Sequence, residues 1–386
     1  MDFSLFITPI SKEKIQNYKE EKNSLGEKTS FFDGTKIENN FNLAILGVNE
    51  SRGGQVKSIK DSPDYVRKHL YSLFPSFDLS IIDLGNIKQG ESVEDTFYAL
   101  SGVISELIKK EIIPIVIGGS QELTYAIYQA YGSLEQVANL VTVDRKIDFL
   151  ESKNITSDTY LRDIILSKPN YLFNYSNIAS QSYYLNPETE EVMRKLYFEN
   201  IRLGEIQKNI EKVEPVLRNC NILSFDMNSI RQAEVPGTSF PSPNGLFGNE
   251  ACQITRYAGM SDKLTVIGFF EMTPEYDIQG QTAHLLAQMI WYFMEGFSLR
   301  KGESPLSSDK NYLQYKVVLS SVEEELVFIK SQKSNRWWMK IPYPPSEKIK
   351  FERHHLVPCN YQDYQTAVKD EMPDLWINTY NRININ

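Results

Sequence analysis

Two aspartates four residues apart close a buried-strand pattern in the segment "NLVTVDRKIDF", residues 139 to 149. Asp144 and Asp148 enclose Arg145 and Lys146. Loops after parallel strands often carry the binding and catalytic groups of α/β proteins, and carboxylates at this spacing are typical ligands of a metal cation. A protonated lysine cannot ligate a metal, so Lys146 is the residue that any functional interpretation of the segment has to explain.

The segment belongs to a series of alternating strand and helix patterns, which favours a parallel sheet covered by helices on both faces. Apolar runs closed by turn residues predict strands at 42–48, 79–85, 112–119, 139–144, 221–226 and 263–271. Apolar residues at three- and four-residue steps predict helices at 62–74, 95–111 and 282–297. In "IIPIVIGGSQE" the two glycines allow a tight turn at the sheet's carboxyl edge, and Ser120 is expected to cap the helix that follows.

The quoted motifs resemble, in order and separation, those of the arginase family of ureohydrolases, which includes agmatinases and formimidoylglutamases. The resemblance is carried by "IPIVIGGSQE", "TVDRKID", "LSFDMN", "VPGTSFPSPNGL" and "GFFEMTP" and covers roughly residues 40 to 300. It implies a three-layer α/β fold with a mostly parallel sheet of about eight strands. It also implies two manganese ions at the carboxyl edge, whose bridging hydroxide hydrolyses a guanidino or formimino C–N bond.

The family's six metal ligands can be compared with this sequence one position at a time. Gln121 stands where the Gly-Gly-Asp-His motif has its histidine. Asp144 and Asp148 match the outer residues of Asp-x-His-x-Asp, but Lys146 replaces the histidine. In Ser-Phe-Asp-x-Asp, Asp226 matches and Asn228 replaces the second carboxylate. Three of the six ligands are therefore missing. Glu271, in the motif Glu-x-x-Pro, matches the family residue that faces the amidine group of the substrate.

Charge gives a physical reason to doubt a two-metal site. Four carboxylates and two neutral imidazoles carry about −4, which two divalent ions balance, whereas three carboxylates and one ammonium carry about −2. The ammonium would also repel a neighbouring dication by several kcal/mol at ~4 Å. We expect no metal, and if any binds, Asp144, Asp148 and Asp226 are its candidate ligands. The Lys146 ammonium is predicted to take the place of a metal cation and to hold these three aspartates together. The alternative is that Lys146 simply points to solvent.

Histidine placement argues in the same direction, since water activation near neutral pH usually recruits imidazole. The four histidines are His69, His284, His354 and His355, and none lies between residues 70 and 283. The first two are predicted to be structural, and the tail pair to be surface or packing residues, unless the tail folds over the pocket. Neither a Gly-x-Ser-x-Gly elbow nor a Gly-x-x-x-x-Gly-Lys loop is present, so no catalytic residue is assigned.

Composition limits the partners. The net charge of −9 argues against a general affinity for nucleic acid, and no apolar stretch is long enough to span a bilayer. We expect a cytoplasmic protein whose three cysteines are buried free thiols. The polar segment near residue 300 predicts a division into an N-terminal lead-in (1–40), an α/β domain (41–300) and a C-terminal extension (301–386). The extension contains three of the four tryptophans, which form either a patch for a partner or an extra layer of packing.

Three hypotheses of function remain. The first is a catalytically silent member of the resembled family that binds a small cationic ligand in the old pocket or a protein partner through its tail. The second is a divergent hydrolase of a linear amidine, guanidine or formimino C–N bond that uses one metal or none, with manganese as its cofactor if there is one. The third is an assembly subunit, because the resemblance implies homo-oligomers.

Overall fold

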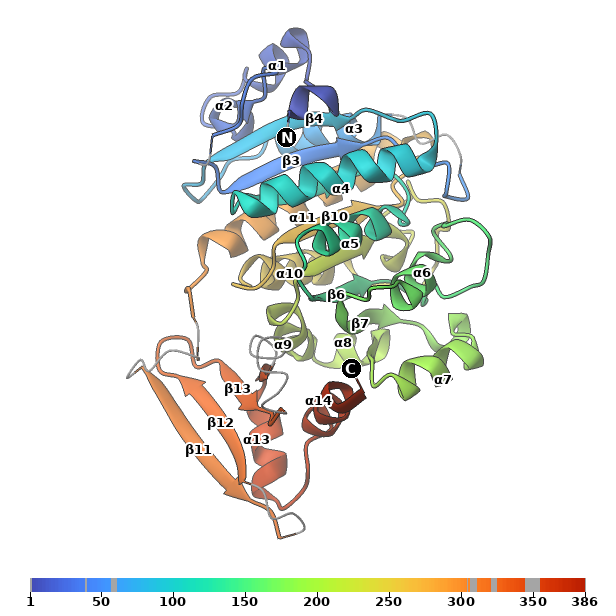
Figure 1. Cartoon of the computed structure of the whole chain (residues 1–386). Helices are drawn as coiled ribbons and strands as arrows, with labels where there is room; N and C mark the ends of the chain where they lie inside the picture. The colour runs from blue at the N-terminus through green and yellow to red at the C-terminus, as the bar shows by residue number, and fades with distance from the viewer. Residues whose placement is uncertain are drawn as a thin grey trace.

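The computed structural model describes residues 2–38, 40–56, 61–303, 305, 311–320, 325–343 and 355–385. A ten-stranded sheet forms its centre, with nine strands in the order β1-β4-β3-β5-β10-β9-β6-β7-β8 and β2 paired to β4 (Figure 1). These strands are β1 (Ile7–Thr8), β2 (Ser30–Phe31), β3 (Leu43–Val48), β4 (Ile81–Ile87), β5 (Ile113–Ile117), β6 (Ala138–Val143), β7 (Leu172–Ser180), β8 (Glu199–Arg202), β9 (Ile222–Asp226) and β10 (Val266–Phe270).

All pairings in this sheet are parallel except the one between β1 and β4. The predicted sheet of about eight mostly parallel strands is therefore confirmed. The two additional strands, β1 and β2, are two residues long and come from the first 40 residues, where no strand was predicted. A two-residue strand is too short to show the periodicity from which strands are predicted.

Helices cover both faces of the sheet. They are α1 (Lys12–Tyr18), α2 (Leu25–Lys28), α3 (Ser62–Leu70), α4 (Val93–Lys109), α5 (Leu123–Ser133), α6 (Tyr160–Leu166), α7 (Pro187–Lys195), α8 (Leu203–Lys208), α9 (Val213–Arg218), α10 (Gly248–Gly259) and α11 (Gln281–Ser298). Buried side chains of α3, α9, α10 and α11 pack on one face, and those of α4, α5, α6 and α7 on the other. The central strands between the two helix layers are buried along their whole length, as is expected for a sheet with helices on both faces.

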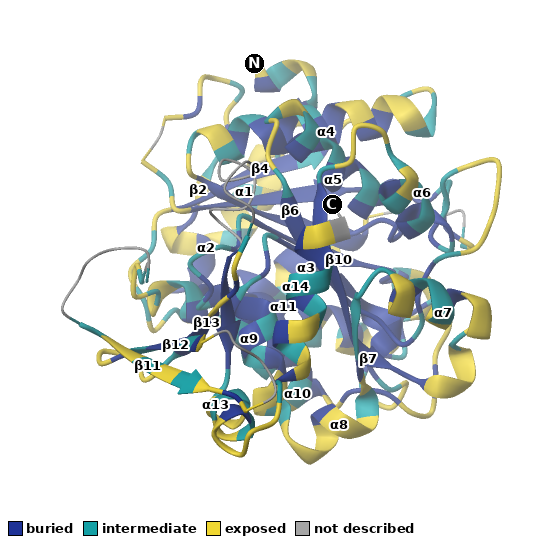
Figure 2. Cartoon of the chain, turned by 60° about the horizontal axis from the view of Figure 1, so that its bottom comes forward, coloured by how far each residue is buried: buried dark blue, intermediate teal, exposed yellow. Residues whose placement is uncertain are grey.

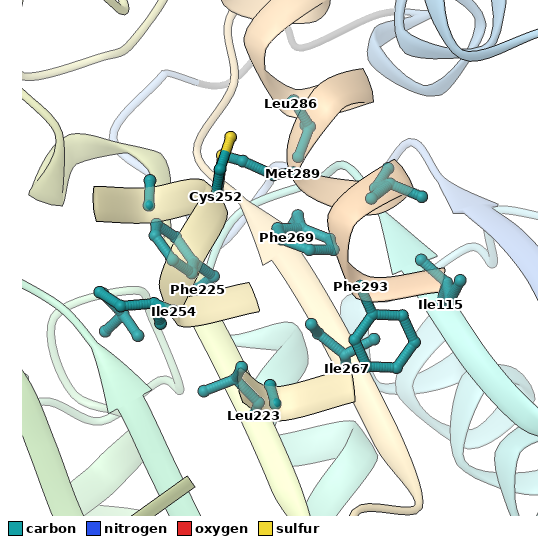
Figure 3. Close-up of a cluster of buried hydrophobic side chains, with 14 of the residues drawn as sticks. Ile115, Leu223, Phe225, Cys252, Ile254, Ile267, Phe269, Leu286, Met289 and Phe293 are labelled. Carbon is teal, nitrogen blue, oxygen red and sulfur yellow. The ribbon is translucent and has the colours of Figure 1, made fainter. Parts of the chain in front are cut away.

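On the first face, the central strands β9 and β10 pack against the helices α10 and α11. The rings of Phe225 on β9 and Phe269 on β10 lie 6.0 Å apart, and Figure 3 shows Met289 and Phe293 of α11 against them. Cys252 of α10 closes this cluster as a buried free thiol. This packing fixes β9 and β10 side by side, and with them the residues that follow each strand.

The C-terminal extension forms a separate antiparallel sheet, which lies beside the amino ends of the central strands (Figure 1). Its elements are β11 (Tyr312–Val318), β12 (Glu325–Ser331), β13 (Trp337–Lys340), β14 (Leu356–Cys359), α13 (Tyr361–Val368) and α14 (Asp374–Ile385). Phe173, near the start of β7, belongs to the extension's hydrophobic cluster. Arg218, at the end of α9, donates to the carbonyl of Cys359 at 3.1 Å and stacks on the Trp338 ring at 4.6 Å.

The extension's tryptophans are buried, with exposed fractions of 4 to 8% for Trp337, Trp338 and Trp376. The packing interpretation of these residues is therefore confirmed, and the patch for a partner is wrong. In Figure 2 the exposed surface of this region lies instead along the outer strand β11. Within the described ranges, none of the helices combines the length and the apolar composition needed to cross a bilayer.

Candidate functional site

Four adjacent central strands, β5, β10, β9 and β6, end at one edge of the sheet. The pairing places Phe270 beside Asp226 and Val143 beside Phe225, so the residues that follow these strands meet. The motifs that begin with Gly118, Asp144, Asp226 and Glu271 are thereby gathered at the carboxyl edge. This edge is where open α/β sheets place ligands.

The turn after β5 depends on its two glycines. Gly118 and Gly119 have φ angles of 96° and 78°, and a side chain on Gly119 would lie 2.6 Å from the carbonyl oxygen of Glu50. The expected cap on the next helix is wrong: α5 begins after Glu122, without a side-chain cap, and Ser120 donates to the Glu122 carboxylate at 2.6 Å. The turn sends the side chain of Gln121 into the site.

The Gln121 amide connects the first two strand ends. Its hydrogen-bonding neighbours fix its orientation: Nε2 donates to Asp144 Oδ2 at 3.1 Å and to Asp148 Oδ2 at 3.2 Å. Its oxygen accepts a hydrogen bond from the Tyr160 hydroxyl at 3.1 Å. Gln121 therefore holds the two aspartates through hydrogen bonds at the position where the resembled family has a metal-ligating histidine.

Lys146 supplies the positive charge, but it reaches different partners from those predicted. Its Nζ lies 2.9 Å from Asp148 Oδ1, an ion pair outside hydrogen-bond geometry, and it donates to the carboxylate of Asp158. From Lys146, Asp144 accepts a hydrogen bond of the backbone N–H, at 3.0 Å, and the ion pairs of the ammonium are with Asp148 and Asp158 and not with Asp226. The side chain is 30% exposed, so it neither points freely to solvent nor lies among all three aspartates.

Asp226 is held by its own neighbour. Its Oδ1 accepts from the backbone N–H of Asn228 at 2.7 Å and from the Asn228 amide at 2.9 Å. The Asn228 oxygen accepts from the backbone N–H of Phe240 at 2.9 Å, and Arg145 donates to the Phe240 carbonyl at 2.7 Å. Asn228 and Arg145 thus fasten the loop 236–246, which gives the loop's turn residues a structural role.

Glu271 has a strained backbone. Its φ of 68° is rare for a residue with a side chain, and such strain often marks functional sites. Its N–H donates to the Gly119 carbonyl at 3.0 Å, and its carboxylate accepts from the backbone N–H of Gln121 at 2.8 Å. Glu122, which sequence reasoning missed, is fully buried and keeps Oε2 without a partner among the described residues.

Burial raises the pKa values of the acidic groups of the site. Burial, then the charges of Asp148 and Asp226, raises the pKa of Asp144 well above its usual value. Burial raises the pKa of Asp226 to about 6 and that of Glu122 to about 7. Burial also raises the pKa of Glu271 well above its usual range, with Asp226 adding to the effect. Burial alone would lower the pKa of Lys146. The negative charges of Asp148, Asp144 and Asp158 outweigh the effect of burial and raise this pKa.

The donor set does not fit two manganese ions. Among the residues with described positions, no three His, Cys, Asp or Glu side chains gather closely enough to hold a metal. The available donors are an amide, a lysine ammonium and aspartates already engaged by N–H groups, whereas manganese prefers carboxylate, imidazole and water ligands. That Asp144, Asp148 and Asp226 would ligate a single ion, if one binds, stays a prediction, and it would require these side chains to move closer together.

Histidines do not complete the site. His69 on α3 stacks on His284 of α11 with ring centroids 5.0 Å apart, which agrees with a structural role. His355 packs on Tyr343 in the extension, at the amino edge of the sheet and so away from these strand ends. The hypothesis that the tail brings His355 to the pocket is therefore wrong, because the extension docks at the opposite edge. His354 lies outside the described residues.

Comparison with known proteins defines the class. A model of the arginase family matches residues 41–295, more than half of the chain, and the chain belongs to that family. The formimidoylglutamase of Macrococcus caseolyticus is 27% identical over 272 residues, spanning 67% of this chain and 86% of the relative. That of Staphylococcus haemolyticus is 26% identical over 259 residues, spanning 64% and 81%.

Solved structures agree on the fold. The crystal structure of Trypanosoma cruzi formiminoglutamase with Mn²⁺ aligns with a TM-score of 0.64 at 19% identity, over 69% of this chain and 97% of that one. Formimidoylglutamase from Bacillus subtilis aligns with a TM-score of 0.65 at 16% identity, over 73% and 94%. This chain is thus a formimidoylglutamase-like arginase-family protein with a C-terminal extension.

Proposed function

We propose that this protein is a non-catalytic member of the arginase family, which uses the fold to bind a ligand or partner. The observation that carries the proposal is the pair of substitutions Gln121 and Lys146. The first engages Asp144 and Asp148 by hydrogen bonds, and the second neutralises Asp148. Side chains of the protein thereby satisfy the carboxylates that would otherwise attract metal ions.

Electrostatics support the same proposal. A dication at the centre of the site would have to displace the Gln121 donor from two carboxylates and approach the Lys146 ammonium. The dication and the ammonium are both positively charged, and at ~4 Å they repel each other by several kcal/mol even with an effective dielectric constant near 20. The acidic side chains of Asp226 and Glu271 would suit a small cation such as an amidine or guanidinium group, which could bind without reacting.

A second candidate function is a divergent hydrolase of a formimino, guanidino or amide C–N bond. The observation in its favour is the buried acid pair Asp226 and Glu271: burial raises the pKa of both, and the pKa of Asp226, about 6, suits proton transfer near neutral pH. This function would depend on these two residues, because no histidine of the described chain lies near them.

A substrate panel separates the two functions. The wild type is incubated with N-formimidoyl-glutamate and with guanidino and amide analogues, with added manganese and with a chelator, and release of formamide, urea or ammonia is measured. Asp226→Asn and Glu271→Gln are the test variants, and the exposed Glu325→Gln is the matched control. No turnover above the uncatalysed rate in any condition is the expected result. Turnover that both site variants abolish and the control retains would overturn the proposal in favour of the hydrolase.

A further inference from the structure

The side chains of the carboxyl-edge site are enclosed by the protein. No more than 4% of each of these residues is exposed: Gln121, Glu122, Asp144, Asp148, Asp226 and Glu271. A ligand of the size of an amidine or guanidinium group can therefore reach them only if a part of the chain around the site moves. The strands that end at the site are buried in the centre of the sheet, so the moving part has to be a loop.

Residues 51–56, which we call the cover segment, lie in the loop after β3 and over one side of the site. A Cβ atom on Gly54 would lie 2.7 Å from the Cβ of Ser120, and one on Gly53 would lie 2.5 Å from the carboxylate of Glu122. Contacts this close leave no room for a side chain on either glycine. The backbone of the cover segment therefore rests directly on the turn that follows β5.

The start of the cover segment is anchored. The guanidinium of Arg52 forms an ion pair with Glu50 at 2.6 Å and donates to the carbonyls of Glu91 at 2.6 Å and Ser92 at 2.9 Å. These contacts tie Arg52 to the start of α4, which lies in the core of the second face. Arg52 is thus a fixed point about which the rest of the segment can turn.

The rest of the cover segment is joined to the loop after β6. The N–H of Ser157 donates to the Gly53 carbonyl at 3.2 Å, and the amide of Gln55 donates to Oδ2 of Asp158 at 2.8 Å. Gln55 is exposed, so water can compete for its hydrogen bond. These two contacts close the segment against the neighbouring loop.

The loop 236–246, which also borders the site, is held more firmly. Its backbone is fastened by Asn228 at 2.9 Å, by Arg145 at 2.7 Å and by the Thr282 hydroxyl at 2.8 Å. Of these two loops, the cover segment is therefore the one that can open with the smaller loss of contacts.

Asp158 connects the cover segment to the charged cluster. Its Oδ2 accepts from Gln55, and its Oδ1 accepts from Lys146, which also forms the ion pair with Asp148. We propose that the cover segment controls access to the carboxyl-edge site, and that the hydrogen bond of Gln55 to Asp158 holds it closed. The segment turns at Arg52 and uncovers the turn after β5. The proposal concerns access alone, so it rests on neither candidate function, and its tests do not measure activity.

Thiol labelling measures the opening. Ser120→Cys places a thiol under Gly54, and the three native cysteines are at most 6% exposed, so they give little background. The probe is methyl methanethiosulfonate, and mass spectrometry of peptides gives the labelling rate at position 120. We expect Gln55→Ala to raise this rate about fivefold, the effect of losing one hydrogen bond. The control is Gln365→Ala, which removes an exposed glutamine of α13. An unchanged rate in Gln55→Ala, or an equal rise in the control, would overturn the proposal.

A pair of glycine substitutions tests the same movement by steric means. Gly54→Ala brings a methyl group against Ser120 and should hold the cover segment open, which raises the labelling rate. The matched control is Gly204→Ala in α8, where a Cβ atom would meet nothing within 4 Å. Neither glycine has a positive φ, so alanine fits both backbones. Equal labelling rates in the two variants would contradict a cover that rests on Ser120.

Hydrogen exchange followed by mass spectrometry tests the proposal without the reporter thiol. In Gln55→Ala, peptides that contain residues 51–56 and 119–124 should exchange faster than in the wild type, whereas those of the loop 236–246 should not change. Unchanged exchange at 51–56, or faster exchange at 236–246 instead, would overturn the assignment of the cover.

Discussion

Lys146 and Gln121 stand at two positions for which the resemblance to the arginase family predicts metal-ligating histidines. Each contacts aspartates that are predicted ligands of the same site: Gln121 contacts Asp144 and Asp148, and Lys146 contacts Asp148. Lys146 also engages Asp158, in the loop after β6. The side chains therefore form a network in which one ammonium and several N–H donors contact the carboxylates.

Removal of the ammonium tests that network. Lys146→Met leaves Asp148 and Asp158 without their cation, and we expect it to lower the free energy of unfolding by on the order of 2 kcal/mol. This is less than for a fully buried pair, because the lysine is partly exposed. The measurement is urea denaturation at neutral pH.

The matched control is Lys316→Met. Lys316 forms an exposed pair with Glu325 at 2.7 Å, and its removal should change stability by about 0.5 kcal/mol or less. Equal effects of the two substitutions would mean that Lys146 is an ordinary surface lysine.

Sequence reasoning predicted which residues gather at this site but not all of their contacts. Four strand ends carry Gln121, Asp144, Asp226 and Glu271, and parallel strands necessarily bring such residues to one edge. Asp158 and Tyr160 come from a loop and a helix start whose course depends on tertiary packing, so no periodicity could place them. Glu122 was missed because its burial follows from the glycine turn before it.

Between elements, the contact of α3 with α11 makes stability depend on pH. Burial, with a smaller effect of His284, lowers the pKa of His69 below 6.5. The unfolded chain then binds a proton more readily than the native one as pH falls through that value. The native state should lose stability below about pH 6.5 as a result.

The variant His69→Phe keeps an aromatic ring against His284 and cannot titrate. We expect the melting temperature of the wild type to fall more than that of the variant between about pH 7.5 and about pH 5, as measured by differential scanning calorimetry. The titratable groups outside this contact are the same in both proteins, so the difference between the two curves reports on the His69–His284 contact. Parallel curves would contradict the predicted shift.

At the scale of the whole molecule, the extension closes the amino edge of the sheet and leaves the carboxyl edge to the candidate site. Its composition predicted a boundary near residue 300. The division of the chain at residues 40 and 300 stays a prediction. The edge at which the extension docks could not be predicted, because it depends on contacts such as Phe173 with the tryptophan cluster, which are remote in sequence.

Phe173→Ala tests whether the core and the extension unfold together. The ring is buried, and its loss should cost about 3 to 4 kcal/mol, whereas Phe173→Leu should cost about 1 kcal/mol. Guanidinium unfolding followed by tryptophan fluorescence and by circular dichroism should give coincident transitions for the wild type. Both transitions should shift together in the alanine variant. A separate early fluorescence transition in the wild type would show that the extension folds independently.

The most direct test of a silenced metal site is elemental analysis of protein purified from manganese-supplemented cells. The wild type is compared with the triple variant Gln121→His, Lys146→His and Asn228→Asp, and with Lys146→Arg as the control that keeps the cation. We expect a small fraction of one metal ion per chain in the wild type and the control, and a clear gain in the triple variant. Stoichiometric manganese in the wild type would contradict the account and favour the divergent hydrolase.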